Sequence, residues 1–239
     1  MDTVKIKSKK TLMIAHRGVS GLETENTLAA FVAAGNRSYF GIETDVHVTR
    51  DGKFAIFHDD KTGRVAEVDL PVEKSDYALL AAFRLYDRGT TTPRCDLCIP
   101  QLADYIRTCK RYDKVAVLEL KNRMETEQIG QIIDVIRKEE YLAKTIFISF
   151  SWENLEDVRS FEPGQTVQFL TGSCDDALIE KLASSKFDLD LERNAATKEL
   201  VKALHKRGIR LNCWTVDNPA EAKKLVGWGV DFITSNILE

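Results

Sequence analysis

The strongest constraint on the fold is a regular alternation of short β-type segments with helical segments along the chain. Eight apolar, β-rich runs predict strands, and seven segments between them carry apolar residues at helical spacing. Strands that alternate with helices form parallel βαβ units. The predicted strands are 12–18, 41–48, 115–121, 145–150, 166–171, 187–191, 210–216 and 231–234, and the predicted helices are 28–34, 102–111, 125–138, 152–160, 176–184, 198–206 and 220–227.

Eight such units in 239 residues predict an α/β fold, the TIM (β/α)8 barrel, which usually takes about 200–250 residues. We therefore expect a single domain over residues 1–239. The rhythm breaks once, where residues 53–59 predict an extra strand and residues 60–98 form an insertion between strand two and helix two. Loops of this length in a compact domain are usually functional. Asn26 and Thr27 are expected to cap the first helix.

Polar side chains gather where the predicted strands end, which is the edge that carries the active site in such barrels. Residues two apart on a strand point to the same face, so Glu43 with Asp45, and Glu119 with Lys121, can enter one cavity. Three carboxylates in one cavity repel each other unless a positive charge lies between them. An all-oxygen site predicts one divalent cation, Mg²⁺ or Ca²⁺. The alternative is a set of core salt bridges with Arg17 and Lys121.

Two histidines at strand ends accompany the acids. His16 and His58 have ordinary pKa values of about 6.5, which suit proton transfer near neutral pH, so we predict a catalytic acid/base pair. His47 lies on the face of the second-strand acids and could approach the metal, but it should sit past the mouth of the barrel. His205 belongs to an amphipathic helix and is expected to be solvated.

Composition and charge restrict the partners. A formal net charge of −3, with 34 basic and 37 acidic residues, provides no positive field for nucleic acid. The apolar run at residues 12–15 is too short for a signal peptide or a membrane span, so we expect a cytoplasmic protein without stable membrane insertion. Five cysteines are too few for a disulfide framework. Cys95 and Cys98 lack the second ligand pair that a zinc site needs.

A series of short motifs extends over nearly the whole chain in a fixed order. They are His16-Arg17-Gly18, Glu25-Asn26-Thr27, Glu43-Thr44-Asp45-Val46, Thr49-Arg50-Asp51-Gly52, His58-Asp59, Ile99-Pro100-Gln101-Leu102, Leu118-Glu119-Leu120-Lys121, Ile148-Ser149-Phe150, Trp214-Thr215-Val216-Asp217 and Gly229-Val230-Asp231. In order and spacing these motifs resemble the glycerophosphodiester phosphodiesterase family, within the phospholipase C-like phosphodiesterase TIM-barrel superfamily.

The resemblance implies roles for individual residues and a reaction. It implies the metal ligands Glu43, Asp45 and Glu119, the catalytic histidines His16 and His58, the phosphate contacts Arg17 and Lys121, and a pocket wall at Trp214. The implied reaction is metal-dependent hydrolysis of glycerophosphodiesters to glycerol 3-phosphate and an alcohol, which belongs to lipid and glycerol metabolism. The alternatives are a phospholipase D-type or cyclising phosphodiesterase on lysophospholipids, and a non-catalytic barrel that binds a phosphorylated ligand.

Three segments depart from the family pattern. Ala103 and Asp104 stand where the family usually has acidic residues, and Thr234-Ser235-Asn236 replaces its usual Thr-Asp ending. We expect both departures to lie away from the chemistry. The insertion has Thr62-Gly63-Arg64-Val65 where the family has an Arg-Thr-Thr-Gly stretch, so this segment is where substrate contacts are expected to differ.

Overall fold

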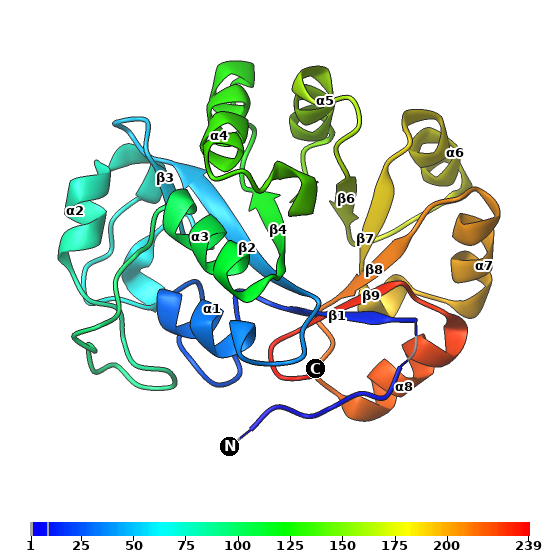
Figure 1. Cartoon of the computed structure of the whole chain (residues 1–239), viewed down its shortest axis with the longest axis horizontal. Helices are drawn as coiled ribbons and strands as arrows, with labels where there is room; N and C mark the ends of the chain where they lie inside the picture. The colour runs from blue at the N-terminus through cyan, green and yellow to red at the C-terminus, as the bar shows by residue number, and fades with distance from the viewer. Residues whose placement is uncertain (1, 9) are drawn as a thin grey trace.

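The structure is a computed structural model that describes residues 2–8 and 10–239. Nine strands in these residues form one sheet, and eight of them are parallel and close into a barrel because β1 pairs with both β9 and β2 (Figure 1). This confirms the predicted TIM barrel. The strands are β1 (Leu12–Ala15), β2 (Gly41–Val48), β3 (Phe54–Ile56), β4 (Val115–Leu120), β5 (Thr145–Ser149), β6 (Val167–Thr171), β7 (Asp188–Glu192), β8 (Leu211–Trp214) and β9 (Phe232–Ser235).

Helices cover the outside of the barrel between successive parallel strands. Each predicted helix is present, with ends within a few residues of the expected ones, because the apolar faces at helical spacing pack against the strands. Thr27 accepts a hydrogen bond from Ala30 N and caps the first helix as predicted. The covering helices are α1 (Leu28–Gly35), α3 (Leu102–Tyr112), α4 (Thr126–Lys138), α5 (Trp152–Phe161), α6 (Asp176–Ser185), α7 (Lys198–Lys206) and α8 (Pro219–Trp228).

The barrel wall separates two apolar regions. Outside it, the large core between strands and helices contains Phe31 and Tyr105, whose ring centroids lie 5.1 Å apart. The Tyr105 hydroxyl donates to the Ile42 carbonyl at 2.7 Å and so ties α3 to β2. Inside the barrel, a smaller buried cluster consists of Ile14, Val117, Ile146, Ile148, Leu170 and Phe232. This cluster fills the interior below the strand ends, so only the carboxyl-terminal mouth is left for a ligand.

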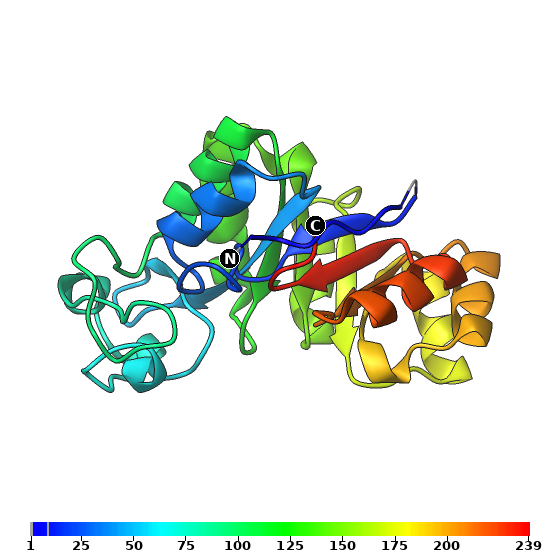
Figure 2. The same ribbon diagram turned by 90° about the horizontal axis from the view of Figure 1, so that it is seen from below.

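The insertion forms a separate layer beside the barrel. It starts after β3, which pairs antiparallel with β2, and it contains α2 (Tyr77–Ala82) and short 3-10 turns. Figure 2 shows the insertion and helices α6 to α8 on opposite sides of the barrel. Its own apolar core consists of Ala55, Phe57, Ala66, Val72, Leu80, Leu85, Leu97 and Ile99. The insertion is therefore packed, and its loops can hold side chains in place.

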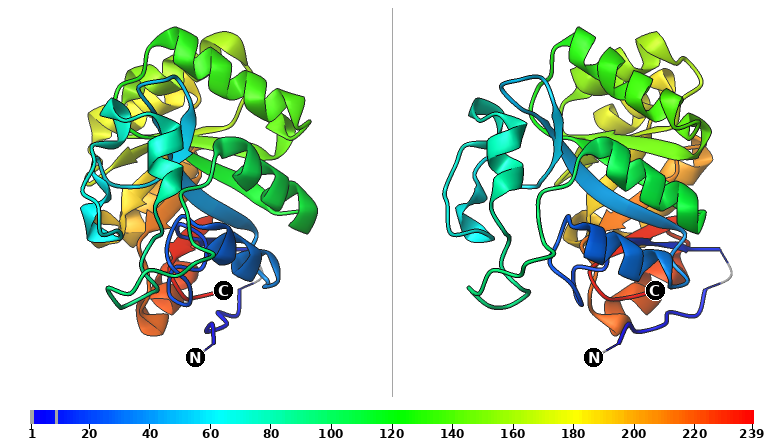
Figure 3. Two further views of the ribbon diagram at one scale, coloured as in Figure 1. Left: turned by 90° about the vertical axis from the view of Figure 1, so that its left-hand side faces the viewer. Right: turned by 60° about the vertical axis from the view of Figure 1, so that its left-hand side comes forward.

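The two ends of the chain lie side by side (Figure 3), and Val4 forms a parallel bridge with Leu238. Among the helices of the described residues, none combines the length and the apolar character that crossing a bilayer requires.

Candidate active site

Three buried carboxylates form the centre of the site. Glu43 and Asp45 lie on β2, and Glu119 lies on β4 beside Asp45 in the parallel register. Alternation along β2 turns both of its acids into the barrel. One oxygen from each of the three side chains lies within 4.8 Å of the others, and all three residues are buried. The sequence-predicted ligands are thus brought together.

Two positive side chains flank these carboxylates. Arg17 has a left-handed backbone, with φ of 52°, and donates its N–H to Glu43 Oε2 at 2.7 Å. Its Nε lies 3.6 Å from Asp45 Oδ2. Lys121 Nζ lies 2.8 Å from Glu119 Oε1 and 3.6 Å from Asp45 Oδ1. The ion pairs of the alternative interpretation are therefore present, but two cations face three acids.

The pKa shifts of the three acids indicate that this pairing is incomplete. Burial, and then repulsion from Asp45 and Glu119, raises the pKa of Glu43 well above its usual value. Burial and Asp45 together raise the pKa of Glu119 to about 7. Burial opposes ionisation of Asp45 too, but Arg17 and Lys121 lower its pKa to about 2. Asp45 Oδ1 is buried and accepts no hydrogen bond from the described residues. This oxygen-only, electron-rich group fits a hard divalent cation.

Asn26 belongs to the candidate site, although the sequence analysis gave it only a role in capping the first helix. It was expected to cap α1, but its backbone is left-handed, with φ of 55°, and its side chain turns back to the barrel. Asn26 Nδ2 donates to Asp45 Oδ2 at 2.8 Å, and Thr44 Oγ1 donates to Asn26 Oδ1 at 2.7 Å. These bonds fix the Asp45 carboxylate and favour its ionised form. The Glu25-Asn26-Thr27 motif was the signal that could have identified it.

The His16 side chain is hydrogen-bonded to a residue near the C-terminus. Its Nδ1 lies 2.8 Å from Asn236 Oδ1, which also accepts from Ser20 Oγ at 2.6 Å. Asn236 Nδ2 donates to Asp217 Oδ2 at 2.6 Å, so the amide orientation is fixed. Burial, followed by the Arg17 charge, lowers the pKa of His16 to about 4. The expectation that the C-terminal departure lies away from the chemistry is therefore wrong for Asn236.

His58 belongs to a chain of ion pairs that reaches into the insertion. His58 Nδ1 lies 2.6 Å from Asp59 Oδ1, and Arg64 Nε donates to Asp59 Oδ2 at 2.6 Å. Arg64 also donates to Glu25 through Nη1 at 2.9 Å and Nη2 at 2.6 Å, and Glu25 accepts from Arg17 at 2.8 Å. Burial lowers the pKa of His58, while Asp59 opposes this shift. The sequence analysis assigned Arg64 no role, because its pairing with Glu25, 39 residues earlier, leaves no local signal in the sequence.

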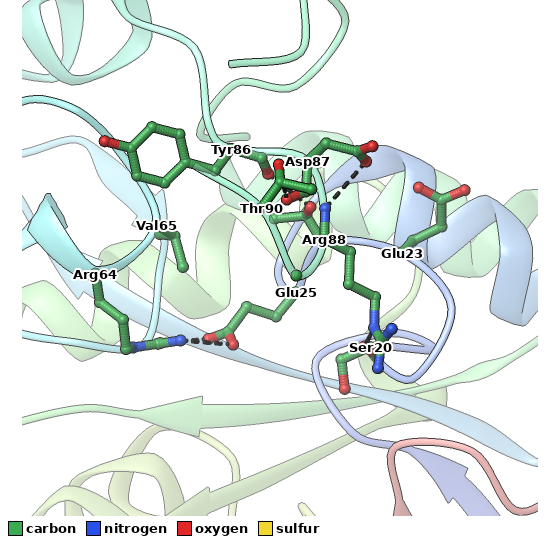
Figure 4. Close-up of a pocket in the computed structure, with 11 residues that line it drawn as sticks. Ser20, Glu23, Glu25, Arg64, Val65, Tyr86, Asp87, Arg88 and Thr90 are labelled. Atoms are coloured by element: carbon green, nitrogen blue, oxygen red, sulfur yellow. Dashed lines mark hydrogen bonds and ion pairs between the residues drawn. The ribbon is translucent and has the colours of Figure 1, made fainter. Parts of the chain in front are cut away.

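Figure 4 shows the Arg64–Glu25 pair as part of the wall of a neighbouring cavity of about 360 Å³. The cavity lies between the loop after β1 and the insertion. Arg88 Nε donates to the Ser20 carbonyl at 2.7 Å, and Thr24 Oγ1 donates to the Tyr86 carbonyl at 2.8 Å. These contacts join the insertion to the mouth of the barrel on the side of Arg64.

The remaining two histidines bond to groups away from the three carboxylates. His47 is buried and places its ring nitrogens 2.9 Å from Glu73 Oε1 and 3.2 Å from the His58 carbonyl. It therefore supports the backbone that carries His58. His205 lies on α7 outside the barrel, and its Nε2 is 2.8 Å from Asp231 Oδ2. The His205 side chain is 40% exposed. Both positions agree with the sequence analysis.

A cavity of about 190 Å³ opens beside the carboxylates. One side is polar and contains both candidate histidines, and the other side is apolar. Trp214 lies on the apolar side, in edge contact with Phe150 at 5.8 Å between ring centroids. The lining residues are His16, Arg17, Glu43, His58, Glu119, Ile148, Phe150, Leu170, Asp190, Trp214 and Thr234. Trp214 is thus at the pocket wall, where the sequence analysis expected it.

Several solved structures and curated sequences that resemble this chain are named phosphodiesterases. A phosphodiesterase from Oleispira antarctica, solved with the product sn-glycerol-3-phosphate, superposes with a TM-score of 0.86 at 25% identity over 95% of this chain and 94% of that one. A glycerophosphodiester phosphodiesterase from Caldanaerobacter subterraneus is 29% identical over 95% of this chain and 94% of the relative. A glycerophosphodiester phosphodiesterase from Bacillus subtilis is 27% identical over 95% of this chain and 84% of the relative.

The fold, the site and these likenesses define an enzyme class, the TIM-barrel phosphoric diester hydrolases. The sequence profile of the Glycerophosphoryl diester phosphodiesterase family matches residues 16–238. The chain belongs to this family.

The substitution Glu43→Gln tests the repulsion between the carboxylates. The folded pKa of Glu43 lies above the ordinary value of about 4.3, so its ionisation increasingly favours the unfolded state as the pH rises above that value. The glutamine side chain would keep an acceptor for the Arg17 N–H without the charge. In chelated protein at about pH 7.5, we expect a melting temperature a few degrees above that of the original chain, and no difference near pH 4.

Thermal denaturation with and without cation provides the measurement. Saturating Mg²⁺ or Ca²⁺ should reverse the order, because the variant loses a ligand. A lower melting temperature for Glu43→Gln in chelator at both pH values would instead favour the salt-bridge interpretation.

The substitution Arg64→Ala tests the link between the insertion and His58. Arg64 holds the carboxylate that orients the imidazole, so we expect kcat for diester hydrolysis to fall about 10-fold or more, with partial recovery in Arg64→Lys. The matched control is Arg50→Ala, which removes a similar two-bond pair with exposed Asp76. Equal activity of both alanine variants would exclude this role for Arg64.

Proposed function

We propose that this enzyme hydrolyses glycerophosphodiesters to glycerol 3-phosphate and an alcohol, with one divalent cation on Glu43, Asp45 and Glu119. The observation that carries the proposal is the arrangement of these three buried acids beside two candidate acid/base histidines in one cavity. Membership of the family supports the substrate class. Mg²⁺ and Ca²⁺ both suit the donor set.

Arg17 and Lys121 are proposed to bind the phosphate. A phosphodiester carries a negative charge that repels an attacking oxygen, and both cationic groups lie next to the acids that would hold the metal. When bound, the cation would supply further neutralisation of the phosphate. The two side chains would then stabilise the charge that develops in the transition state through charge-assisted hydrogen bonds.

His16 is proposed to act as the general base. The amide of Asn236 is oriented so that its oxygen faces His16 Nδ1, which places the proton on Nδ1 and a lone pair on Nε2. With a pKa of about 4 the imidazole is neutral near pH 7 and can accept a proton from the attacking oxygen.

His58 is proposed to act as the general acid. Burial lowers the pKa of His58, and Asp59 opposes this shift by accepting a hydrogen bond from Nδ1, so that the imidazolium form can carry the Nε2 proton for the leaving alkoxide. Arg64 keeps Asp59 ionised, since it lowers the pKa of that carboxyl to about 2 against the opposing effect of burial.

Trp214 is proposed to form a wall for the carbon skeleton of the substrate, because its ring faces the cavity beside Phe150. A cytoplasmic location and a part in lipid and glycerol metabolism stay predictions from the sequence.

An assay of product release tests the proposed function. Several glycerophosphodiesters and a lysophospholipid are incubated with the enzyme, and glycerol 3-phosphate and cyclic phosphate are measured. Chelation should abolish release of glycerol 3-phosphate from the soluble diesters, and added Mg²⁺ or Ca²⁺ should restore it. Full activity after exhaustive chelation would refute the cation site. Exclusive cleavage of the lysophospholipid, or an accumulating cyclic phosphate, would favour the phospholipase D-type or cyclising alternative.

The substitutions His16→Ala and His58→Ala test the acid/base pair. Each should lower kcat by roughly 10²-fold or more, because a proton-transfer group is lost, while cation affinity changes little. The control is His205→Ala, whose histidine pairs with Asp231 outside the barrel. Steady-state kinetics and cation titration provide the measurements. A near-normal kcat in either variant would remove that histidine from the mechanism.

A further inference from the structure

One carboxyl group in the barrel remains unused by the proposed mechanism. Asp190 lies in the middle of β7, between Leu189 and Leu191, which pack in the outer core. Alternation along the strand therefore turns Asp190 into the barrel. It is 2% exposed and lines the same cavity as Glu119 and Trp214.

Asp190 has no hydrogen-bond partner for its buried oxygen. Within the described part of the chain, Asp190 Oδ1 accepts no hydrogen bond, and neither amide atom of the inward-facing, fully buried Gln168 makes one. A buried polar group without a partner destabilises the folded state, so native proteins rarely keep one without a use. The neighbouring Asn212 and Thr234 bond to each other across β8 and β9. A ligand in the cavity can supply the missing partner of Asp190.

The surroundings decide what kind of ligand group this can be. The positive charges of Arg17, Lys121 and the proposed divalent cation outnumber the negative charges of the three carboxylates, and this disfavours a positively charged group in the same cavity. A hydroxyl is neutral and can both donate and accept, so it can bond a carboxyl group in either protonation state. Burial, and then the charge of Glu119, raises the pKa of Asp190 well above its usual value, although the nearby Asn212 side chain opposes this shift, so the carboxyl group is able to donate as well.

The size and lining of the cavity suit a short polyol that carries a phosphate group. Its volume is about 190 Å³, and Ile148, Leu170 and Trp214 provide an apolar wall beside Asp190. We propose that Asp190 is a specificity-determining residue that hydrogen-bonds a hydroxyl of the glycerol moiety while the phosphate lies at the carboxylate site. This inference rests on the proposed function, because it takes the phosphate position from it. Sites that bond a substrate hydroxyl discriminate against analogues that lack it.

Ligand binding to the cation-loaded protein tests the proposal without catalysis. Isothermal titration calorimetry compares glycerol 3-phosphate with propyl phosphate, which has the same carbon chain without hydroxyls. We expect the original chain to prefer glycerol 3-phosphate by about 10-fold or more. Asp190→Leu, a change of similar size, should remove this preference and leave the affinity for propyl phosphate within about threefold. Asp190→Asn can donate and accept, and should keep most of the preference.

Stability measurements separate this role from a structural one. Because Asp190 Oδ1 has no partner within the described residues, Asp190→Leu should melt at or above the temperature of the original chain. The control is Asp188→Asn on the same strand, which loses the ion pair with Arg210 and should keep the ligand preference. If Asp190→Leu does not fold, Asp190→Ala provides the same comparison.

Two results with the Asp190 variants would overturn the proposal. One is an unchanged preference in the folded leucine or alanine variant, and the other is an equal loss of affinity for both ligands. If the original chain binds neither ligand in the presence of cation, the proposed phosphate site itself fails. Binding of both ligands with equal affinity by the original chain would retain the phosphate site and exclude the hydroxyl contact.

Discussion

Mutual repulsion between buried carboxylates is the constraint on which the rest of this site depends. Three acids within 4.8 Å of one another would disfavour the folded chain if nothing positive lay near them. Arg17 and Lys121 supply part of the compensation, and the left-handed backbone of Arg17 lets both its N–H and its guanidinium reach the acids. A divalent cation would supply the rest. The same groups that make the apo site unfavourable are thus the ones proposed to bind a cation and a phosphate anion.

The barrel makes this arrangement possible because its parallel strands hold the acids rigidly. Asp45 and Glu119 are neighbours in register on paired strands, so backbone hydrogen bonds set their separation. The histidines lie on less regular segments and need other support. Asn236 holds one, and Asp59 with Arg64 holds the other. The strands therefore position the carboxylates, and hydrogen bonds position the two histidines that are proposed to transfer protons.

The insertion contributes to the site from outside the barrel. It has its own apolar core, and this packing allows Arg64 to keep a fixed position between Asp59 and Glu25. Charge-assisted bonds then connect the insertion with the loop that follows β1. The insertion is in this way joined to the residues for which catalytic roles are proposed, and changes in its loops can alter activity as well as substrate choice.

The sequence by itself determined the barrel and the central acids, because period-two and helical patterns are local and the pleat fixes which side chains share a face. Glu43, Asp45 and Glu119 could be assigned to one cavity on that ground. Only the tertiary structure decided the roles of Asn26, Arg64 and Asn236, together with the missing partner of Asp190. Each depends on which distant segments meet at the mouth, and hydrogen bonds across large sequence separations leave no periodic signal in the chain.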